Sequence, residues 1–394
     1  MISRQSEARG ACIIGVGESR FSKRGVQAKR GEWALACEAT ANAADDAGID
    51  VRHIDGLASF SGDSCLPWLM QQALGIERLR FASMVWGGGG AGSCGALAHA
   101  AGAIESGQAD TVLVFRSIVQ RPGSRYGEAG GFSEIPQLDL VAPFGMLTPA
   151  SMFAPTVRRY IHEFGTRPEN FAEVAITFRR NAQRNPRAVT YGKTLTLEEY
   201  FSSRMIADPL RLYDCCQESD GACALIMTTL ERARDMKGVP VRILAAAQGG
   251  NARWNAATMG NHNMPDDEYG SGNAAQLARD LYARAGVTAA DIDVAQIYDH
   301  FGAAVLMSLE NFGFCGRGEA GPFVAEGNIR LEGSLPVNTA GGLLSEAYIH
   351  GLNLVVEAVR QLRGSSTAQV QGATTCLVTG GLGSTPTSAA ILTV

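Results

Sequence analysis

The feature that most constrains the fold of this chain is a pattern that occurs twice. An apolar, strand-like run leads into a glycine turn, then a helix-like run rich in small residues, then a second apolar run. The two copies lie near residues 81–115 and 335–379. Such a duplication predicts two similar α/β halves packed against each other.

The same alternation runs through most of the chain. Strands are expected at residues 11–17, 54–60, 81–86, 111–115, 221–228, 239–247, 294–298, 335–338, 375–379 and 389–394, and helices at 32–47, 66–74, 94–106, 272–285, 301–312 and 350–362. Strands separated by helices predict a largely parallel sheet covered by helices. With 394 residues, 46% of them hydrophobic, the chain can bury a large core. We place the N-terminal half at 1–235 and the C-terminal half at 236–394.

The rhythm breaks between about residues 116 and 205, where prolines and aromatic residues gather. We interpret this stretch as a long loop insertion over an active site, with helical pieces near 156–164 and 169–183. Its large apolar residues suit either a flat polycyclic substrate, a partner protein or dimer packing: Tyr126, Phe132, Phe144, Met146, Met152 and Phe153.

Composition excludes several classes of function. The net charge is −5 and no basic stripe stands out, which argues against nucleic-acid binding. The sequence contains no apolar run of 18 residues, so we expect no membrane span. The N-terminus lacks the apolar core of a signal peptide. The nine cysteines are scattered without metal-ligand spacing, which favours buried free thiols, no bound metal and a cytoplasmic location.

The first glycine turn allows three interpretations. Residues 90–95 match Gly-x-Gly-x-x-Gly between a strand and a helix. A dinucleotide site would need an acidic residue after the next strand, but Arg116 stands there and Asp110 precedes the strand. The turn could instead only allow close packing. Alternatively, its N–H groups at the start of the helix could stabilise a developing negative charge.

Five other segments carry a resemblance that covers essentially the whole chain. Residues 13–21, 207–222, 296–301 (QIYDHF), 337–342 (VNTAGG) and 379–383 are similar to the corresponding segments of the lipid-transfer type of thiolases. The resemblance implies the thiolase fold, in which two βαβαβαββ halves form a five-layer αβαβα sandwich. It also implies a homodimer.

The departures from that family concern its catalytic residues. Gly89 stands where the family has its nucleophilic cysteine, and Tyr298 and Tyr348 stand where it has two histidines. His300 replaces the cysteine of the family's His-Asp-Cys-Phe box, and Leu377 the second thiolase cysteine, with Cys376 one residue away on the other side of the strand. A Claisen thiolase needs an acyl-cysteine and a base to form its thiolate, so thiolase chemistry is not expected.

A pocket that keeps the scaffold but lacks the nucleophile suits a retro-aldol cleavage of a β-hydroxyacyl-CoA. This reaction needs two proton-transfer groups and one oxyanion site, with no covalent intermediate. We assign proton transfer to Tyr298 and Tyr348, assisted by His300, and leave Asp299 a supporting role. Each of these side chains could instead be packing in the core. Substrate and oxyanion binding are assigned to a further set of residues: Gly89, Gly90, Asn338, Gly341 and Gly381.

This combination resembles the thiolase-like aldolases that shorten the steroid side chain in bacterial sterol and bile-acid catabolism. The resemblance implies a 17-hydroxy steroid CoA ester as substrate, with a 17-keto steroid and propionyl-CoA, or acetyl-CoA for a shorter side chain, as products. It implies no cofactor in this chain, and a small OB-fold partner with a zinc ribbon that carries any zinc. The alternatives are a non-catalytic acyl-CoA or lipid-binding subunit, and an acyltransferase that uses an unconventional cysteine such as Cys94.

Overall fold

The two halves of the chain share one continuous sheet and one strand order. The computed structural model describes residues 10–86, 89–120, 142–250, 268–269, 273–383 and 386–394. In the N-terminal half the order is β4-β3-β5-β8-β1, with bounds β1 Ala11–Glu18, β3 Gly56–Phe60, β4 Phe81–Val85, β5 Thr111–Ile118 and β8 Ser219–Thr229. The strands β3, β4 and β5 are mutually parallel, and β8 is antiparallel to β5 and β1.

The C-terminal half repeats this arrangement. Its order is β10-β11-β12-β9, with bounds β9 Val241–Gly249, β10 Val294–Gln296, β11 Thr375–Thr379 and β12 Thr387–Thr393. A single parallel bridge from Val337 to Ala295 of β10 takes the place of the outermost strand. If the strands of each half are numbered 1 to 5 along the sequence, with the bridge at Val337 counted as strand 3 of the C-terminal half, both halves have the spatial order 3-2-4-5-1. The halves join where β1 pairs with β9, and we propose the domain boundary between β8 and β9, at 235.

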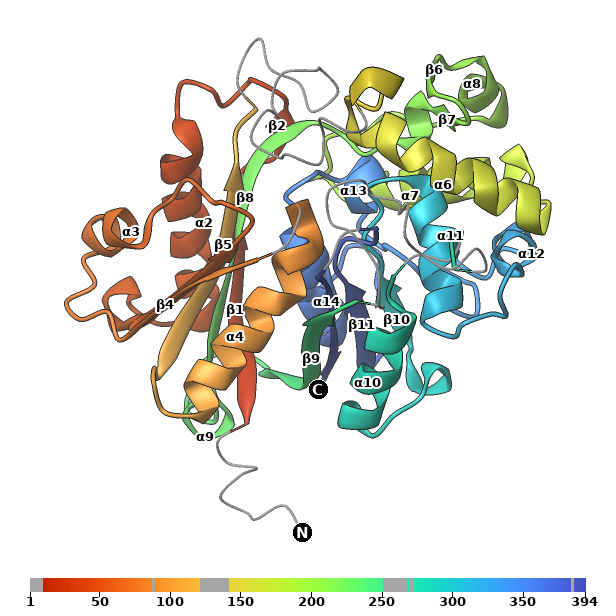
Figure 1. Ribbon diagram of the computed structural model, residues 1–394. Coiled ribbons are helices and arrows are strands. Elements are labelled where there is room, and N and C mark those ends of the chain that lie inside the picture. Colours follow the sequence, from red (N-terminus) through yellow and green to blue (C-terminus); the bar gives the residue numbers. More distant parts are fainter. Residues whose placement is uncertain (1–9, 87–88, 121–141, 251–267, 270–272, 384–385) are drawn as a thin grey trace.

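Helices and the two sheet halves alternate as five layers (Figure 1). On the outer side of the N-terminal half lie α2 (Gly31–Ala47) and α3 (Pro67–Leu74), while α4 (Ser93–Glu105) and α14 (Leu352–Leu362) occupy the middle. Beyond the C-terminal half lie α10 (Ala275–Ala285) and α11 (Gly302–Asn311). This is the αβαβα sandwich that the resemblance implies.

Three hydrophobic cores separate these layers, and strand alternation decides which core each residue joins. Ile14 of β1 packs with Leu35 of α2 in the first outer core, whereas Ile13 faces the central core. In β11, Cys376 belongs to the central core and Leu377 to the second outer core. The two residues therefore face opposite sides, as expected.

Close approach of α2 to β1 requires glycine in the first strand. A Cβ at Gly15 would lie 2.2 Å from the carbonyl oxygen of Ala43, and a Cβ at Gly17 2.3 Å from that of Ala39. Both contacts are shorter than van der Waals distance, so larger residues would push the helix off the sheet.

The described part of the insertion is largely helical and contains the two helical pieces expected near 156–164 and 169–183. It forms α6 (Pro149–Phe164), α7 (Pro168–Ala182) and α8 (Leu197–Ser202), with the short pair β6 (Met205–Ala207) and β7 (Leu210–Arg211). The apolar residues recur at helical spacing in α6, where Phe153, Val157 and Tyr160 are buried, and this amphipathic face outweighs the proline content. Tyr126 and Phe132 lie outside the described residues. Phe144 is exposed, whereas Met152 is buried.

Shorter elements complete the fold: β2 (Ser22–Lys23), α9 (Leu230–Ala233), α12 (Ala320–Ala325), α13 (Gly342–Ser345), and single 3-10 turns at Val51–His53, Gly89–Gly92, Ala142–Phe144, Leu212–Asp214 and Ala289–Asp291. No helix in the described part of the chain is long and apolar enough to cross a membrane. Within the same residues, no group of three or more His, Cys, Asp or Glu could hold a metal ion.

Candidate active site

In the first glycine turn, Gly89, which has no side chain, faces two tyrosine hydroxyls. Gly89 follows β4 and has φ +53°. A Cβ built there would lie 3.6 Å from Tyr348 Oη and 3.8 Å from Tyr298 Oη. The two hydroxyls are joined by a hydrogen bond of 3.1 Å. The three positions that depart most from the family pattern therefore meet at one point in space.

Tyr298 is held tightly by the backbone around it. The N–H of Gly90 donates to Tyr298 Oη at 3.1 Å, and the N–H of Tyr298 donates to Thr379 Oγ1 at 3.0 Å. A Cβ at Gly90 would lie 1.9 Å from Tyr298 Cε2, and a Cβ at Gly351 2.7 Å from Cδ2. The ring thus fits only because both residues are glycine. Gly351 was not identified from the sequence, where a single glycine carries no signal of what it packs against.

Tyr348 lies on the segment that leads into α14, and a serine fixes its backbone. Its N–H donates to Ser219 Oγ at 2.8 Å. The ring of His350, a residue at φ +47°, lies edge-on to the Tyr348 ring with centroids 5.0 Å apart. Neither Ser219 nor the strained backbone at His350 was identified from the sequence.

A buried arginine links His350 to the loop after β3. Arg116 Nε donates to His350 Nδ1 at 3.0 Å, and Arg116 Nη1 donates to Phe60 O at 2.7 Å and lies 3.3 Å from Asp63 Oδ2. Burial and the nearby Arg116 charge hold the pKa of His350 well below its usual value, so the ring is neutral. In the same loop, Ser61 Oγ donates to Gly89 O. Arg116 therefore supports both the Tyr348 segment and the glycine turn.

His300 lies beside Tyr298 in an aromatic environment. Its ring centroid is 5.3 Å from that of Tyr298, 4.9 Å from Phe301 and 5.5 Å from Phe153, which comes from α6 of the insertion. Both ring nitrogens are buried and make no hydrogen bond within the described residues. Burial lowers the pKa of His300 to about 4, so it is a neutral and weak base near pH 7.

Asp299 supports the next turn rather than facing the tyrosines. Its carboxylate accepts the N–H groups of Leu343 and Leu344 at 2.8 and 3.0 Å. Burial raises its pKa to about 7, although these hydrogen bonds act in the opposite direction. The geometry agrees with the supporting role expected for this residue.

Three of the residues expected to bind substrate instead donate hydrogen bonds to other groups of the protein. Asn338 donates to Ile297 O and accepts the N–H of Ile297, and the N–H of Gly341 donates to Asn338 O. The N–H of Gly90 is directed to Tyr298, as described above. These donors therefore hold the strand end that carries Tyr298. Gly381 packs on the first turn, where its Cβ would lie 3.1 Å from the backbone nitrogen of Ala91.

The cysteines near the site lack the character of nucleophiles. Cys94 is fully buried, its Sγ contacts Val378 O at 3.6 Å, and burial raises its pKa to about 12. Cys376 is likewise buried, with its pKa raised well above the ordinary value. A thiol with so high a pKa is almost fully protonated near neutral pH, so both residues are packing residues.

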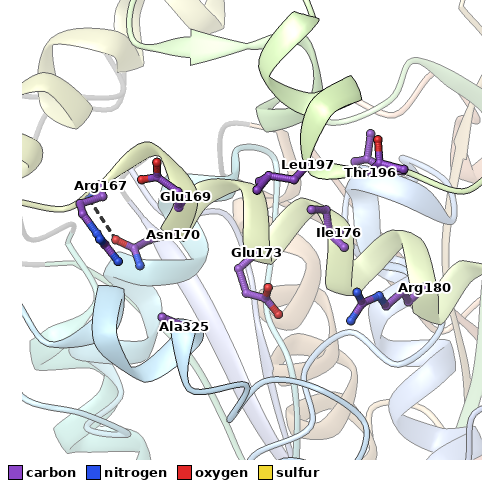
Figure 2. A pocket seen from close by; sticks show the side chains of 10 residues that line it. Arg167, Glu169, Asn170, Glu173, Ile176, Arg180, Thr196, Leu197 and Ala325 are labelled. Carbon is purple, nitrogen blue, oxygen red and sulfur yellow. Dashed lines mark hydrogen bonds between the residues drawn. The ribbon is translucent and has the colours of Figure 1, made fainter.

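A hollow of about 340 Å³ opens beside the glycine turn. It is lined by Ser61, Gly62, Met84, Val85, Trp86 and Gly89. A larger hollow of about 500 Å³ lies along the outer side of α7, facing the start of α8 and Ala325 of α12 (Figure 2). Charged residues such as Arg167, Glu173 and Arg180 line it, and none of the residues around the two tyrosines does. The smaller hollow is therefore the one that reaches the site.

Known proteins are similar in sequence to this chain over nearly its full length. A family model described as "Thiolase C-terminal domain-like" matches residues 256–393. A "17-hydroxy-3-oxo-4-pregnene-20-carboxyl-CoA lyase" of Mycobacterium tuberculosis is 43% identical, over 97% of this chain and 98% of that protein. A "Steroid side-chain-cleaving aldolase" of Thermomonospora curvata is 42% identical, over 97% of each.

Solved structures agree in fold. A solved structure named "Ltp2-ChsH2(DUF35) aldolase" has a TM-score of 0.90 and 41% identity, and the match covers 99% of both chains. Human mitochondrial 3-ketoacyl-CoA thiolase, at 15% identity and a TM-score of 0.70, shares the fold, over 98% of this chain and 99% of that one. The chain therefore belongs to the thiolase superfamily, within the lipid-transfer thiolase-like branch that contains the steroid side-chain-cleaving aldolases, and it is a carbon–carbon lyase.

Proposed function

We propose that this lyase cleaves the Cα–Cβ bond of a β-hydroxyacyl-CoA by a retro-aldol reaction without a covalent enzyme intermediate. The observation that carries the proposal is the space in front of Gly89, which faces two hydrogen-bonded tyrosine hydroxyls and to which the described residues bring no nucleophile. The hollow lined by Met84 and Trp86 gives an acyl chain a route to this point.

The tyrosine pair can move the single proton that this reaction relocates. When the bond breaks, the substrate hydroxyl becomes a carbonyl and loses its proton, while the bond electrons pass to Cα as an enolate that gains a proton. If Tyr298 takes the hydroxyl proton, passes its own to Tyr348, and Tyr348 protonates Cα, then both phenols end protonated. The reaction therefore needs no other base.

The surroundings favour Tyr298 as the proton acceptor of the pair. The N–H of Gly90 donates to its oxygen and so stabilises negative charge there. The partly exposed side chain of Tyr348 suits delivery of a proton to Cα. We assign His300 a binding role, in which its buried ring nitrogens hydrogen-bond a polar group of the substrate or a trapped water.

For the substrate we propose a 17-hydroxy steroid with a CoA-thioester side chain, giving a 17-keto steroid and propionyl-CoA, or acetyl-CoA from a shorter side chain. The support is the full-length similarity to a relative whose name specifies a 17-hydroxy pregnene carboxyl-CoA. We also propose a homodimer that binds a small OB-fold/zinc-ribbon protein, because the similar solved aldolase structure carries a DUF35 component in its name.

The decisive experiment compares tyrosine variants in the presence of the partner protein. Tyr298→Phe and Tyr348→Phe should each lower kcat by about 100-fold or more, because each interrupts the proton relay. Tyr282→Phe is the matched control, since its hydroxyl donates to Phe312 O away from the site. Release of the ketone and the short acyl-CoA is followed by mass spectrometry.

Two results would contradict the assignment. If the double variant Tyr298→Phe/Tyr348→Phe turns over like the control, the tyrosines do not carry the reaction. If the unaltered protein binds the thioester but never cleaves it with any partner, the chain is a binding subunit.

A further inference from the structure

A buried arginine joins the two sides of the candidate active site. Arg116 lies near the end of β5 and is only 6% exposed. Its Nε donates to His350 Nδ1 at 3.0 Å, and its Nη2 donates to Ser61 O at 3.4 Å. Ser61 Oγ in turn donates to Gly89 O, and His350 follows Tyr348 by two residues. One guanidinium therefore contacts both the loop that holds the glycine turn and the segment that carries the tyrosine.

The arginine determines which nitrogen of the His350 ring carries the proton. An arginine N–H can only donate, so Nδ1 of His350 must be the acceptor. In a neutral imidazole the proton is then on Nε2. Burial and the charge of Arg116 hold the pKa of His350 well below its ordinary value. The ring therefore keeps this one form near neutral pH.

The other contacts of Arg116 fix the position of the guanidinium. Its Nη1 donates to Phe60 O at 2.7 Å and lies 3.3 Å from Asp63 Oδ2. The same carboxylate oxygen accepts the hydroxyl hydrogen of Ser59 at 2.8 Å, and the Asp63 side chain has no exposed surface. A side chain whose donors are used in a buried network has little freedom to move. The neighbouring imidazole is therefore bound to a fixed partner.

Unusual backbone conformations occur at the residues that Arg116 contacts. Apart from glycine, three of the described residues have a left-handed φ: Ser61 at +57°, Asn338 at +49° and His350 at +47°. Two of the three accept hydrogen bonds from Arg116. Such conformations are sparsely populated by residues that have a side chain, and they persist where the surrounding contacts impose them. The hydrogen bonds of Arg116 therefore help to hold the backbone on both sides of the site.

We propose that Arg116 is a positioning residue that holds the Tyr348 segment in place through His350. The His350 ring lies edge-on to the Tyr348 ring, with centroids 5.0 Å apart. Tyr348 Oη in turn lies 3.6 Å from a Cβ built at Gly89. If residue 350 is released from the arginine, the tyrosine hydroxyl loses this place. The inference rests on the proposed function because it takes Tyr348 as a proton-transfer group.

Two substitutions of His350 separate the role of its side chain from that of its backbone. Glycine and asparagine both tolerate a positive φ, but only asparagine has an oxygen that can accept from Arg116. His350→Gly should lower kcat by about 10-fold or more and leave KM for the thioester unchanged, because the ring positions Tyr348 and does not contact substrate. His350→Asn should be faster than His350→Gly by about 3-fold or more, because it keeps one hydrogen bond. Equal kcat values in the two variants would overturn the proposal.

Arg116→Lys tests the other member of the pair. Lysine keeps the positive charge beside Asp63, but its single nitrogen cannot reach the imidazole ring and the two carbonyl oxygens together. We expect kcat to fall by about 10-fold, and the loss should not add to that of His350→Gly, because both break the same contact. Arg52→Lys, in a surface pair with Asp50, is the control and should leave kcat unchanged. Additive losses would show that Arg116 does not act through His350.

Nuclear magnetic resonance separates this proposal from the proposed reaction, since it requires no turnover. With isotope-labelled tyrosine, the signal of Tyr348, identified by its loss in Tyr348→Phe, should move in Arg116→Lys and stay in place in Arg52→Lys. With isotope-labelled histidine, His350 should show a bare Nδ1 and a protonated Nε2. An unmoved Tyr348 signal in Arg116→Lys would overturn the positioning role even if the tyrosines prove catalytic. A moved signal together with full activity of Tyr348→Phe would support the positioning role and contradict the proton relay.

Discussion

At the scale of single residues, the position of the Tyr298 ring depends on two neighbouring glycines that have no side chain. Gly90 and Gly351 flank the ring so closely that a methyl group at either would overlap it. The same Gly90 supplies the N–H that the tyrosine oxygen accepts. One glycine thus provides both the space and the hydrogen bond that orient a proton-transfer group.

Gly90→Ala should therefore damage activity more than stability. The added Cβ would lie 1.9 Å from Tyr298 Cε2, so the ring must move and its hydroxyl must leave Gly90 N. Overpacking of this kind costs about 1–3 kcal/mol, and a displacement near 1 Å can reduce kcat by about 100-fold. Thermal unfolding and steady-state kinetics measure the two effects.

Gly102→Ala is the control, because nothing lies within 4 Å of the Cβ it would add. Full activity in Gly90→Ala would show that the orientation of Tyr298 is unimportant.

Sequence reasoning was most successful where family positions could be matched one by one. Matching of family positions predicted that Gly89, Tyr298 and Tyr348 belong to one site, and the structure places these residues together. It assigned substrate contacts to Asn338 and Gly341, whose donors bond within the protein, because a sequence motif does not show where a donor points. Arg116 was considered only for a dinucleotide site, since its partner His350 is 234 residues away.

At the scale of elements, the outermost strands of the two halves differ. The N-terminal half has a full β4, whereas the C-terminal half has only the bridge at Val337. The expected strand at 335–338 is short because Pro336 lacks an N–H and Asn338 turns the chain at φ +49°. The glycine pattern revealed the duplication, but not the loss of this strand.

If the protein forms the proposed homodimer, we expect the second copy to dock at the outer edge of β4. The strand pairs only with β3 in the described sheet, and Met84 on the strand and Trp86 just after it are exposed. An open apolar edge favours pairing with another strand. Ala82→Lys should therefore shift the protein from dimer to monomer in light scattering, because a lysine on an edge strand opposes such pairing.

Ala290→Lys, on the exposed 3-10 turn Ala289–Asp291, is the control for the added charge. A dimer of equal stability in both variants would place the contact elsewhere.

At the scale of the whole molecule, buried acids connect stability to pH. Burial raises the pKa of Asp299 to about 7 from an ordinary value near 4, so the folded state holds this proton more tightly than the unfolded state. Its contribution to stability is complete below about pH 4 and is lost as pH rises through about 7. Glu346, with its pKa raised to about 8 by burial, acts in the same direction. The pKa of His300 is instead lowered to about 4, so its contribution to stability is present above about pH 6.5 and is lost as pH falls through about 4.

Comparing the unaltered protein with Asp299→Asn isolates one of these groups. The free energy of unfolding, measured with urea from pH 4 to 8, should fall less steeply with rising pH in the variant, because the other groups titrate equally in both proteins. The variant should also be less stable overall at pH 4, since an amide has one acceptor oxygen, whereas the Leu343 and Leu344 N–H groups bond to the two different oxygens of Asp299. Identical slopes would show that Asp299 has an ordinary pKa.

The fit of Tyr298 between two glycines also has an evolutionary consequence. Because neither Gly90 nor Gly351 leaves room for a methyl group beside the ring, each can be replaced only after residue 298 has become smaller. Any descendant protein that keeps Tyr298 must therefore also keep Gly90 and Gly351. Restoring a cysteine at position 89 would place a thiol against two phenols rather than two imidazoles, so no single substitution leads from this site back to acyl transfer.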